Sequence, residues 1–446
     1  MPAIVYRILE VLSPMVMPLP IGTNLALWHL LWALISGRLL LSRGAIIPAL
    51  AASGLKSQAV RRAWTALAYG AWEISALLAP WQRLIKQEGR WRAHRQGGYR
   101  PVAVDLVGFL RPRLRGCATK HYLSQAGKAL PAISFGVLAA IGSVGQQVVP
   151  ILRAVVRHPS GTASEKPLLV AVLKKARQLL LPDEILLTDR GFPLLQISAA
   201  GIPHFVARVA KNFTARRATV PTYAGHGRRP TRGELVRPLP RTYRGHRLLA
   251  TPPHRSESWL DHGRRLRVDF WDNLVAPNRK APADGSFTCA LMHDPAYHDP
   301  LLVVTNVTTL SGPQLRALYR DRWPIEQIPL TSKQLLGAGR QFVFAAEPRQ
   351  RLPELALFAG SLLMYLAATQ TVQPTGFWDR APRPTAGRFR RSLARLDFSD
   401  LWPLPEQIRK KRSVTAHLPK GIAAHRRISV QPVPVRHRYG TRLARV

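Results

Sequence analysis

The first chemically promising feature of the chain is a set of four polar side chains at helical spacing. Tyr319, Arg322, Glu326 and Lys333 stand at relative positions 0, 3, 7 and 14. At about 100° per residue, one continuous α-helix would carry all four within an arc of about 60°. A phenol, two cations and one carboxylate make poor core material. On so narrow a stripe they suit a surface that meets phosphate and a metal ion together.

Three carboxylates share an unusual setting. Asp105 and Asp189 are preceded by the apolar runs Val-Ala-Val and Ile-Leu-Leu-Thr, and Glu326 belongs to the stripe. In a chain with only 24 acids, a carboxylate beside a core needs a stabilising partner. Mg²⁺ and Mn²⁺ prefer carboxylate oxygens, so we interpret the three as metal ligands. The alternatives are an arginine pair for Asp105, a helix N-cap for Asp189 and an Arg322 pair for Glu326.

The charge balance indicates the partner. The 446 residues include 65 Lys and Arg but only 24 Asp and Glu, for a net charge of +41. Such an excess attracts polyanions, of which nucleic acid is the commonest; membrane surfaces and acidic polymers are the competing interpretations. Hydrophobic residues make up 46% of the chain, which excludes a wholly disordered basic protein. The length suggests two to four domains.

Cysteine usage and apolar runs bear on the compartment. Only Cys117 and Cys289 occur, without a CxxC pair, which excludes a disulfide framework and a cysteine zinc site. A cytoplasmic location, at the bacterial nucleoid, is the simplest inference. The apolar runs 24–35 and 355–368 are too short to span a bilayer, so we predict that both are buried helices.

The first 95 residues have a mostly helical pattern. Ser42 is a candidate cap for a helix ending at Leu50, 51–54 resembles a turn, and a basic helix is expected over 56–69. Helix, turn and basic helix resemble a helix-turn-helix, although plain helix packing explains the pattern equally well. The segment 82–99 is basic with interleaved aromatic residues and is interpreted as a linker.

The middle of the chain predicts an α/β domain. Alternating and β-branched runs predict three strands, then a helix, a strand, a helix and a strand, the order of a ribonuclease-H-like domain: 102–107, 133–141, 147–157, 166–180, 185–189, 192–200 and 204–209. A Pro-, Gly- and Arg-rich β segment follows, then a strand at 301–305, the helix of the stripe and a buried helix over 351–371. Pro324 and Pro329 interrupt the stripe, so its arc requires mild kinks or a fresh helical segment starting with Pro324 at N1.

The predicted organisation has five parts. After residue 381 the chain has 16 Lys and Arg against 3 acids, which predicts a loosely ordered electrostatic tail. The fold class is therefore α/β: a ribonuclease-H-like core, interrupted by a β-rich insertion, behind a helical N-terminal domain. The predicted parts are a helical DNA-binding domain (1–99), the first part of the core (100–210), the β-rich insertion (211–300), the second part of the core (301–373) and the basic Pro/Arg-rich tail (374–446).

These motifs together resemble a known family. Asp105, the run Thr188-Asp189-Arg190-Gly191-Phe192, and Tyr319-x2-Arg322-x3-Glu326-x6-Lys333 look like the signature of DDE transposases of bacterial insertion sequences. The group is the insertion-sequence-4-like one, marked by a Tyr-Arg-Glu-Lys helix. The resemblance covers roughly residues 100–370, including the β-rich insertion before the last acid.

The resemblance implies a mechanism and partners. Asp105, Asp189 and Glu326 would be catalytic and would hold two Mg²⁺ or Mn²⁺ ions. The metal ions would activate the nucleophile and stabilise the leaving oxygen during cleavage of transposon ends and strand transfer into target DNA. The implied partners are double-stranded DNA, as terminal inverted repeats and target, and a second copy in a synaptic homodimer.

The remaining signature residues resemble DNA-binding groups rather than reacting ones. Tyr319, Arg322 and Lys333 would hold phosphates of the terminal nucleotides. Arg190 and Arg208 are further DNA-contact candidates, although a salt bridge at the edge of the core explains each of them as well.

Two other functions stay open at this point. A tyrosine recombinase would use Tyr319 or Tyr439 as nucleophile, with an HxxR partner such as His226–Arg229 or His262–Arg265. That route needs no metal ion. A non-catalytic DNA-binding protein descended from a transposase is the second alternative, and the presence of all three acids argues against it.

Overall fold

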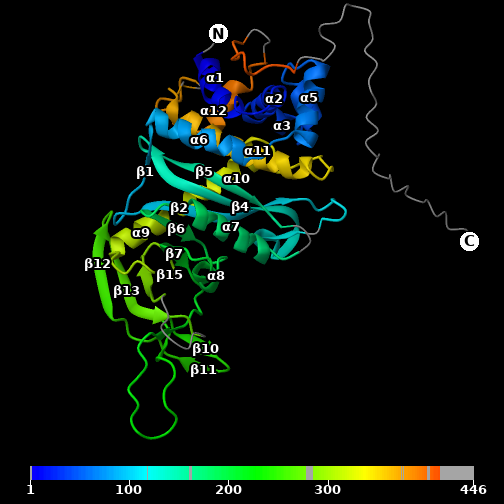
Figure 1. Ribbon diagram of the computed structural model, residues 1–446. Coiled ribbons are helices and arrows are strands. Elements are labelled where there is room, and N and C mark those ends of the chain that lie inside the picture. The colour runs from blue at the N-terminus through cyan, green and yellow to red at the C-terminus, as the bar shows by residue number, and fades with distance from the viewer. Residues whose placement is uncertain are drawn as a thin grey trace, which may run out of the picture. The chain divides into compact units, whose positions relative to one another are not determined.

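The computed structural model describes residues 3–117, 119–159, 163–277, 285–372, 374, 376–398 and 402–411. Met1–Arg409 forms one compact unit, and the second unit, Lys410–Val446, lies almost wholly outside the described residues, as does Tyr439. The fold is mixed α/β, built on a large mixed sheet with helices packed on it (Figure 1). The α/β class predicted from the sequence is confirmed.

The N-terminal region is helical, as predicted. Its helices are α1 (Ala3–Val16), α2 (Thr23–Ile35), α3 (Arg38–Leu41), α4 (Ile46–Ala51), α5 (Ser57–Tyr69) and α6 (Ser75–Glu88). The predicted buried helix at 24–35 is confirmed, because almost every residue of α2 is buried. The Ser42 cap is wrong: α4 begins after Ala45, and the Ser42 hydroxyl donates to the Leu39 and Ala45 carbonyls.

The segment 82–99 is not a linker. Its first part completes α6, and Trp91–Ala93 forms strand β1, which pairs antiparallel with β4 (Lys128–Val144). The Trp91 indole nitrogen donates to the Val149 carbonyl at 2.8 Å. A basic composition suggested exposure, but strand pairing at the sheet edge satisfies this backbone instead.

The centre of the molecule is the sheet, which has 13 strands among the described residues. The strands predicted from the sequence are confirmed as β2 (Arg100–Leu110), β4, β5 (Gln147–Arg157), β6 (Glu184–Thr188), β7 (Phe205–Arg208) and β15 (Leu301–Thr305). They lie side by side as β5-β4-β2-β6-β7-β15. β6 runs parallel to β2 and to β7, whereas β4 and β15 run antiparallel to their neighbours.

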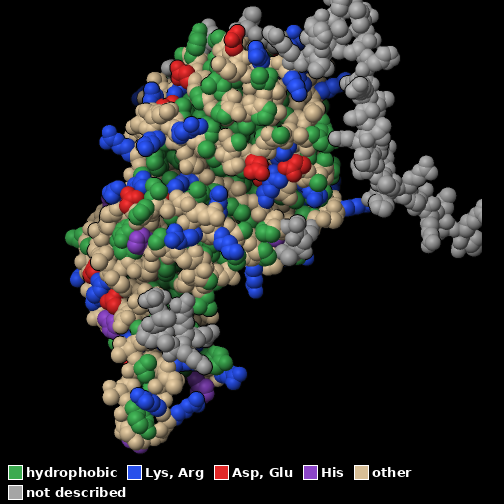
Figure 2. Space-filling view, viewed as in Figure 1, with side chains coloured by type: hydrophobic (Ala, Val, Ile, Leu, Met, Phe, Trp, Pro, Cys, Tyr) green, Lys and Arg blue, Asp and Glu red, His purple; other side chains and the backbone are tan. Residues whose placement is uncertain are grey.

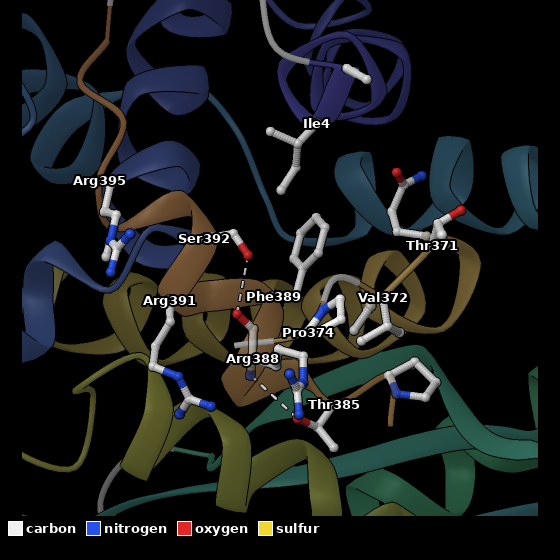
Figure 3. Close-up of a pocket in the computed structure, with 15 residues that line it drawn as sticks. Ile4, Thr371, Val372, Pro374, Thr385, Arg388, Phe389, Arg391, Ser392 and Arg395 are labelled. Atoms are coloured by element: carbon white, nitrogen blue, oxygen red, sulfur yellow. Dashed lines mark hydrogen bonds between the residues drawn. The ribbon is translucent and has the colours of Figure 1, made fainter. Parts of the chain in front are cut away.

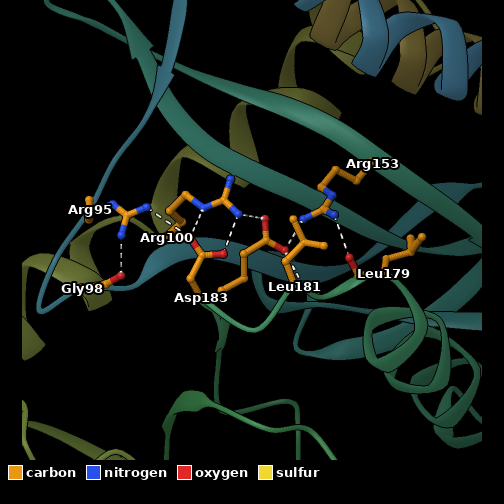
Figure 4. Close-up of polar contacts among 8 residues, drawn as sticks. Arg95, Gly98, Arg100, Arg153, Leu179, Leu181 and Asp183 are labelled. Atoms are coloured by element: carbon orange, nitrogen blue, oxygen red, sulfur yellow. Dashed lines mark hydrogen bonds and ion pairs between the residues drawn. The ribbon is translucent and has the colours of Figure 1, made fainter. Parts of the chain in front are cut away.

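An ion-pair network holds the start of β2 beside the start of β6 (Figure 4). Asp183 accepts from Arg100 at 2.6 Å and from Arg95 at 3.1 Å, while Glu184 pairs with Arg153 at 2.7 Å. The parallel register places Arg100 beside Glu184 and Ala103 beside Leu187. These contacts therefore help to fix the register of β2 against β6, and so decide which residues are neighbours at the carboxyl end of β6.

The predicted β-rich segment is confirmed, and its longer strands extend the same sheet. β14 pairs with β15 and with β13, and β13 pairs with β12 and β8. β10 and β11 form a separate hairpin. The strands are β8 (Ala215–Arg217), β9 (Leu235–Val236), β10 (Arg241–Tyr243), β11 (His246–Leu248), β12 (Arg255–Asp261), β13 (Arg264–Val275) and β14 (Phe287–His293); a short strand β3 (Lys120–Leu123) pairs with β4.

Two apolar clusters cover the two faces of the sheet. Helices α7 (Lys166–Leu179) and α8 (Leu194–Ala199) pack on one face, and α11 (Pro348–Thr369) with the N-terminal helices packs on the other. α11 is long and apolar enough to cross a membrane, but 89% of its most apolar window is buried inside the protein. It is therefore the core helix that was predicted for 351–371.

Part of the tail packs against the rest of the protein, which corrects the prediction of a loosely ordered segment for the described residues 386–398 and 402. Helix α12 (Ala386–Leu393) packs against α11, and Trp402 lies edge-on to Trp32 with ring centroids 4.7 Å apart. Phe398 lies 5.5 Å from Trp28. Large aromatic side chains bury enough area to outweigh the surrounding charge. The prediction for residues 412–446 lies outside the described residues.

Candidate active site

The sheet brings the first two predicted carboxylates to neighbouring positions. Asp105 lies in the middle of β2, and Asp189 directly follows β6. Continuing the β2–β6 register by two residues brings Asp105 level with Asp189. Neighbouring strands are about 4.8 Å apart, and level residues of parallel strands point to the same face. Residues 84 positions apart in the chain thus share one place at the carboxyl end of β6.

The electrostatics of Asp105 bring in the third carboxylate. Burial, together with the charges of Asp189 and Glu326, raises the pKa of Asp105 to about 7, while Arg322 opposes the shift. One favourable contact is the Leu106 amide, which donates to Asp105 Oδ1 at 2.8 Å. Carboxylates that repel one another in a site partly shielded from solvent are all stabilised when a cation binds between them.

The signature segment is helical but is not one continuous α-helix, so the predicted 60° arc is wrong. It comprises α9 (Gly312–Arg320), a 3₁₀ turn at Trp323–Glu326, α10 (Gln327–Leu330) and a π turn at Thr331–Leu335. Pro324 is the second residue of the 3₁₀ turn, which follows a break at Asp321 and Arg322. Because proline lacks an amide donor, the chain restarts there instead of continuing α9.

Side chains of the insertion hold α9 in place. Ser311 caps the helix in a capping box with Gln314. Arg316 pairs with Asp261 at the end of β12 and with Asp294 after β14, the latter at 2.7 Å. The Gly312 amide donates to Glu257 at 2.7 Å. The β-rich insertion therefore anchors the helix that leads into the break.

Arg322 links two of the carboxylates. Its side chain is buried, and its Nη2 lies 2.7 Å from Glu326 Oε1. Burial works against the charged form, yet the pKa of Arg322 is raised, because Tyr319, Glu326 and Asp105 stabilise the cation. The guanidinium also stacks 4.5 Å from the Trp323 ring centroid. The Arg322–Glu326 pair foreseen as an alternative is present, and it coexists with coupling to Asp105.

Lys333 and Tyr319 complete the described surroundings of Asp105. Lys333 Nζ lies 5.3 Å from the Phe109 ring centroid; burial lowers the pKa of Lys333 and the Asp105 charge partly offsets this. Tyr319 is only 4% exposed, and its hydroxyl has no partner among the described residues. A buried unpaired hydroxyl is a poor nucleophile towards DNA, but it can donate to a ligand that reaches it.

The structure places the other predicted residues less centrally. Asp189 Oδ1 accepts from the Gly191 amide at 2.9 Å, and α8 starts later with Pro193 as its N-cap, so the N-cap interpretation of Asp189 is wrong. Arg190 is exposed beside Asp189, and Arg208 is exposed at the end of β7. Neither arginine is among the main causes of the pKa shift of Asp105.

The spacing of the three carboxylates and their donor chemistry bear differently on whether a divalent cation fits. Among the described residues, no three His, Cys, Asp or Glu side chains stand close enough together to hold a metal ion. The donor chemistry does fit, because two further carboxylates raise the pKa of Asp105, and the opposing contributions of Arg322 and the Leu106 amide do not cancel the shift. The chain thus supplies suitable donors at one place, and their side chains are not assembled into a ligand cage.

A cavity elsewhere in the molecule is unrelated to the carboxylates. It has a volume of about 860 Å³ and lies where α12 meets the start of α1 and the end of α11, lined by Ile4, Thr371 and Phe389 among others (Figure 3). In its wall the Arg388 amide donates to Thr385 at 3.3 Å. None of the three carboxylates lines it, so it gives no support to the metal-site prediction.

One polar cluster beside the signature segment was not predicted from the sequence. His94 Nδ1 lies 2.9 Å from Asp321 Oδ1, and His94 Nε2 lies 2.6 Å from Ser143 Oγ. Since a carboxylate only accepts, Nδ1 donates to Asp321 and Nε2 accepts from Ser143 when the ring is neutral. The three residues come from distant segments, and the only signal in the sequence was an acid adjacent to Arg322.

Comparison with known proteins adds no relative. A scan of the chain against models of protein families found no match, and a search of curated proteins found no similar sequence. The geometry of the chain's own residues is therefore what supports a functional proposal.

Proposed function

We propose that the chain is a DDE transposase that cleaves the ends of its own DNA element and joins them to target DNA. The observation that carries the proposal is the convergence on Asp105 of the charges of Asp189 and Glu326, opposed by Arg322. The five-strand order β5-β4-β2-β6-β7, with β4 antiparallel, supports a ribonuclease-H-like core, in which the third, second, first, fourth and fifth strands lie in that order.

The proposed roles follow from burial and charge. Asp105, Asp189 and Glu326 would hold the divalent cations, Mg²⁺ or Mn²⁺. When bound, such ions lower the pKa of a nucleophilic water or hydroxyl and neutralise the leaving oxygen. Arg322 keeps Glu326 oriented through its ion pair and offers the rest of its guanidinium to a phosphate. Lys333, at the Asp105 side of the site, supplies a second cation for the DNA backbone.

The charge of the chain supports a DNA partner. The chain has a net charge of +41, and Figure 2 shows Lys and Arg side chains scattered over the visible face, with Asp and Glu at fewer places. Non-specific attraction to the phosphate backbone follows from such a surface. Double-stranded DNA with terminal repeats, a homodimer holding two ends, and a cytoplasmic location belong to the same proposal.

The tyrosine recombinase is the weaker alternative. Its nucleophile must reach a phosphate, and the Tyr319 hydroxyl is buried. Tyr439 lies outside the described residues. A non-catalytic DNA-binding protein would not need a half-buried carboxylate whose pKa is raised to about 7.

The test uses the purified full chain and labelled duplexes taken from the DNA flanking its gene, where short inverted repeats are expected. With Mg²⁺ or Mn²⁺ the chain should cleave the repeats and transfer their 3′ ends. Asp189→Asn and Glu326→Gln should abolish cleavage yet bind the same duplex, and Glu10→Gln, at an exposed acid remote in sequence, should behave as wild type. Full activity in EDTA, or a covalent phosphotyrosine adduct, would refute the proposal.

A further inference from the structure

The segment after the signature residues presents two phenylalanine side chains to solvent. Phe342 and Phe344 are each 61% exposed, whereas Gln341 and Val343, which alternate with them, are buried. This alternation of buried and exposed side chains places both rings on the same, outward side. Exposing two large apolar rings next to each other has no benefit for folding, so a function in binding is indicated.

The backbone of this segment is held from two sides. The Phe342 amide donates to the Gly44 carbonyl at 3.3 Å, and Arg111 Nη2 donates to the Val343 carbonyl at 2.6 Å. Gly44 has a φ of +92°, and a Cβ there would lie 2.2 Å from the Arg340 carbonyl oxygen, so the close approach requires glycine. The two rings therefore stand on a fixed backbone rather than on a free loop.

Strand β2 connects the two rings to the candidate active site. Odd-numbered residues of β2 share one face, which carries Asp105 and Phe109, and Arg111 follows the strand in the same alternation. Lys333 lies over Phe109, and the Arg111 guanidinium lies 5.6 Å from the Phe344 ring centroid. At about 3.3 Å per residue, Arg111 is about 20 Å from Asp105. A few nucleotides of extended DNA span that distance.

Positive charge surrounds the rings. Arg340 precedes the segment and is exposed, and Arg43 is exposed next to the Gly44 contact. Arg349 lies close enough to Arg111 to lower its pKa further, after the larger effect of burial. The acid of the segment 340–349, Glu347, is neutralised by ion pairs to two other arginines, both at 2.8 Å. An occupant of this surface should therefore combine planar apolar groups with negative charge.

We propose that Phe342 and Phe344 form a stacking platform for unpaired bases of DNA, whose phosphates lie along the flanking arginines. Single strands bind proteins in this way, through aromatic faces and a basic track. The link between the platform and catalysis rests on the proposed transposase function, because strand β2 joins the two rings to the candidate active site. Its affinity for single-stranded DNA is measurable without catalysis.

The test is binding of the full chain, in EDTA, to a single-stranded oligonucleotide of about ten bases containing 2-aminopurine. Stacking on the rings should change the 2-aminopurine fluorescence on binding. Phe342→Ala and Phe344→Ala should each weaken binding about 5- to 150-fold, and Phe→Leu at either position should weaken it too, since leucine offers no flat face. Tyr297→Ala, at a residue that is 70% exposed in the insertion, is the matched control and should bind normally.

Salt dependence separates stacking from charge. The two Phe variants should keep the wild-type slope of log affinity against log salt, whereas Arg340→Ala should make it shallower. Unchanged affinity and fluorescence in the double Phe→Ala variant would overturn the proposal. So would loss of a dimer in sedimentation with normal DNA binding, because the rings would then contact a second copy. A failure of metal-dependent cleavage alone would refute the transposase function and leave this binding result standing.

Discussion

Replacing Asp105 by asparagine should stabilise the metal-free protein at pH 8 while abolishing cleavage. The pKa of the Asp105 carboxyl rises from 3.8 to about 7, first through burial and then through the neighbouring carboxylates. The folded protein thus holds the Asp105 proton more tightly than the unfolded chain does. The free energy that protonated Asp105 contributes to folding is fully present below about pH 4 and is lost as the pH rises through about 7. Asparagine avoids that loss, because it has no charge to bury.

The magnitude follows from the shift. About three pKa units at about 1.4 kcal/mol each correspond to a loss of about 4 kcal/mol at pH 8, an upper figure because Asp105 is only half-buried. For a chain of this size, about 4 kcal/mol moves the midpoint of thermal unfolding by about 5 °C. The asparagine variant should therefore melt higher than wild type at pH 8 and close to wild type at pH 4.

The assay is thermal unfolding of both proteins in EDTA from pH 4 to pH 8. Taking the difference between the two removes the pH dependence of all other groups. Asp183→Asn, at the opposite end of β6, is the control, and its effect on stability should have the opposite sign. Arg100 lowers the pKa of Asp183, so removing the Asp183 carboxylate should destabilise the protein at neutral pH. Adding Mg²⁺ or Mn²⁺ should raise the melting temperature of the wild-type protein but not that of Asp105→Asn. Parallel curves for wild type and Asp105→Asn would refute the reasoning.

Three further predictions concern neighbouring contacts. Arg322→Ala should raise the pH at which the protein loses the stability contributed by protonated Asp105, because Arg322 lowers the pKa of Asp105. An unchanged midpoint pH would contradict an electrostatic interaction between Arg322 and Asp105. His94→Ala should cost about 1–3 kcal/mol in urea unfolding by leaving buried Asp321 without its donor, and His94→Gln should cost less; equal losses would show that the hydrogen bond is unimportant. Trp402→Ala should cost about 2–3 kcal/mol and speed tryptic cleavage near residue 395, whereas exposed Trp378→Ala should do neither.

Local pattern was enough to predict most elements. The β-branched runs at 102–107, 185–189 and 301–305 became β2, β6 and β15, and the apolar runs became the buried helices α2 and α11. Their signal is strong because a chain segment with apolar residues at period 2 or 3.6 has few other ways to bury them. Asp105 and Asp189 were informative for the same reason, since acids preceded by apolar runs are rare, whereas Glu326 was found from its spacing to Tyr319, Arg322 and Lys333.

Errors arose where distant partners override local composition. The basic segment 82–99 joins the sheet because β4 offers it an edge, and in the described part of the Arg-rich tail Trp402 packs against Trp28 and Trp32. The charge of those segments is visible locally, whereas the partner that outweighs it is not. The exact path of the signature segment was equally hidden, although its two prolines signalled a break.

The sequence by itself determined which residues can do chemistry: three acids, two cations and a phenol in a chain charged for a polyanion. Only the tertiary structure determined which of these residues lie close together. The β2–β6 register puts Asp105 level with Asp189, and the broken helix after α9 brings Arg322, Glu326 and Lys333 within reach of the Asp105 charge. Electrostatic interaction depends on distance and burial, and both are properties of packing between segments that lie up to 228 residues apart.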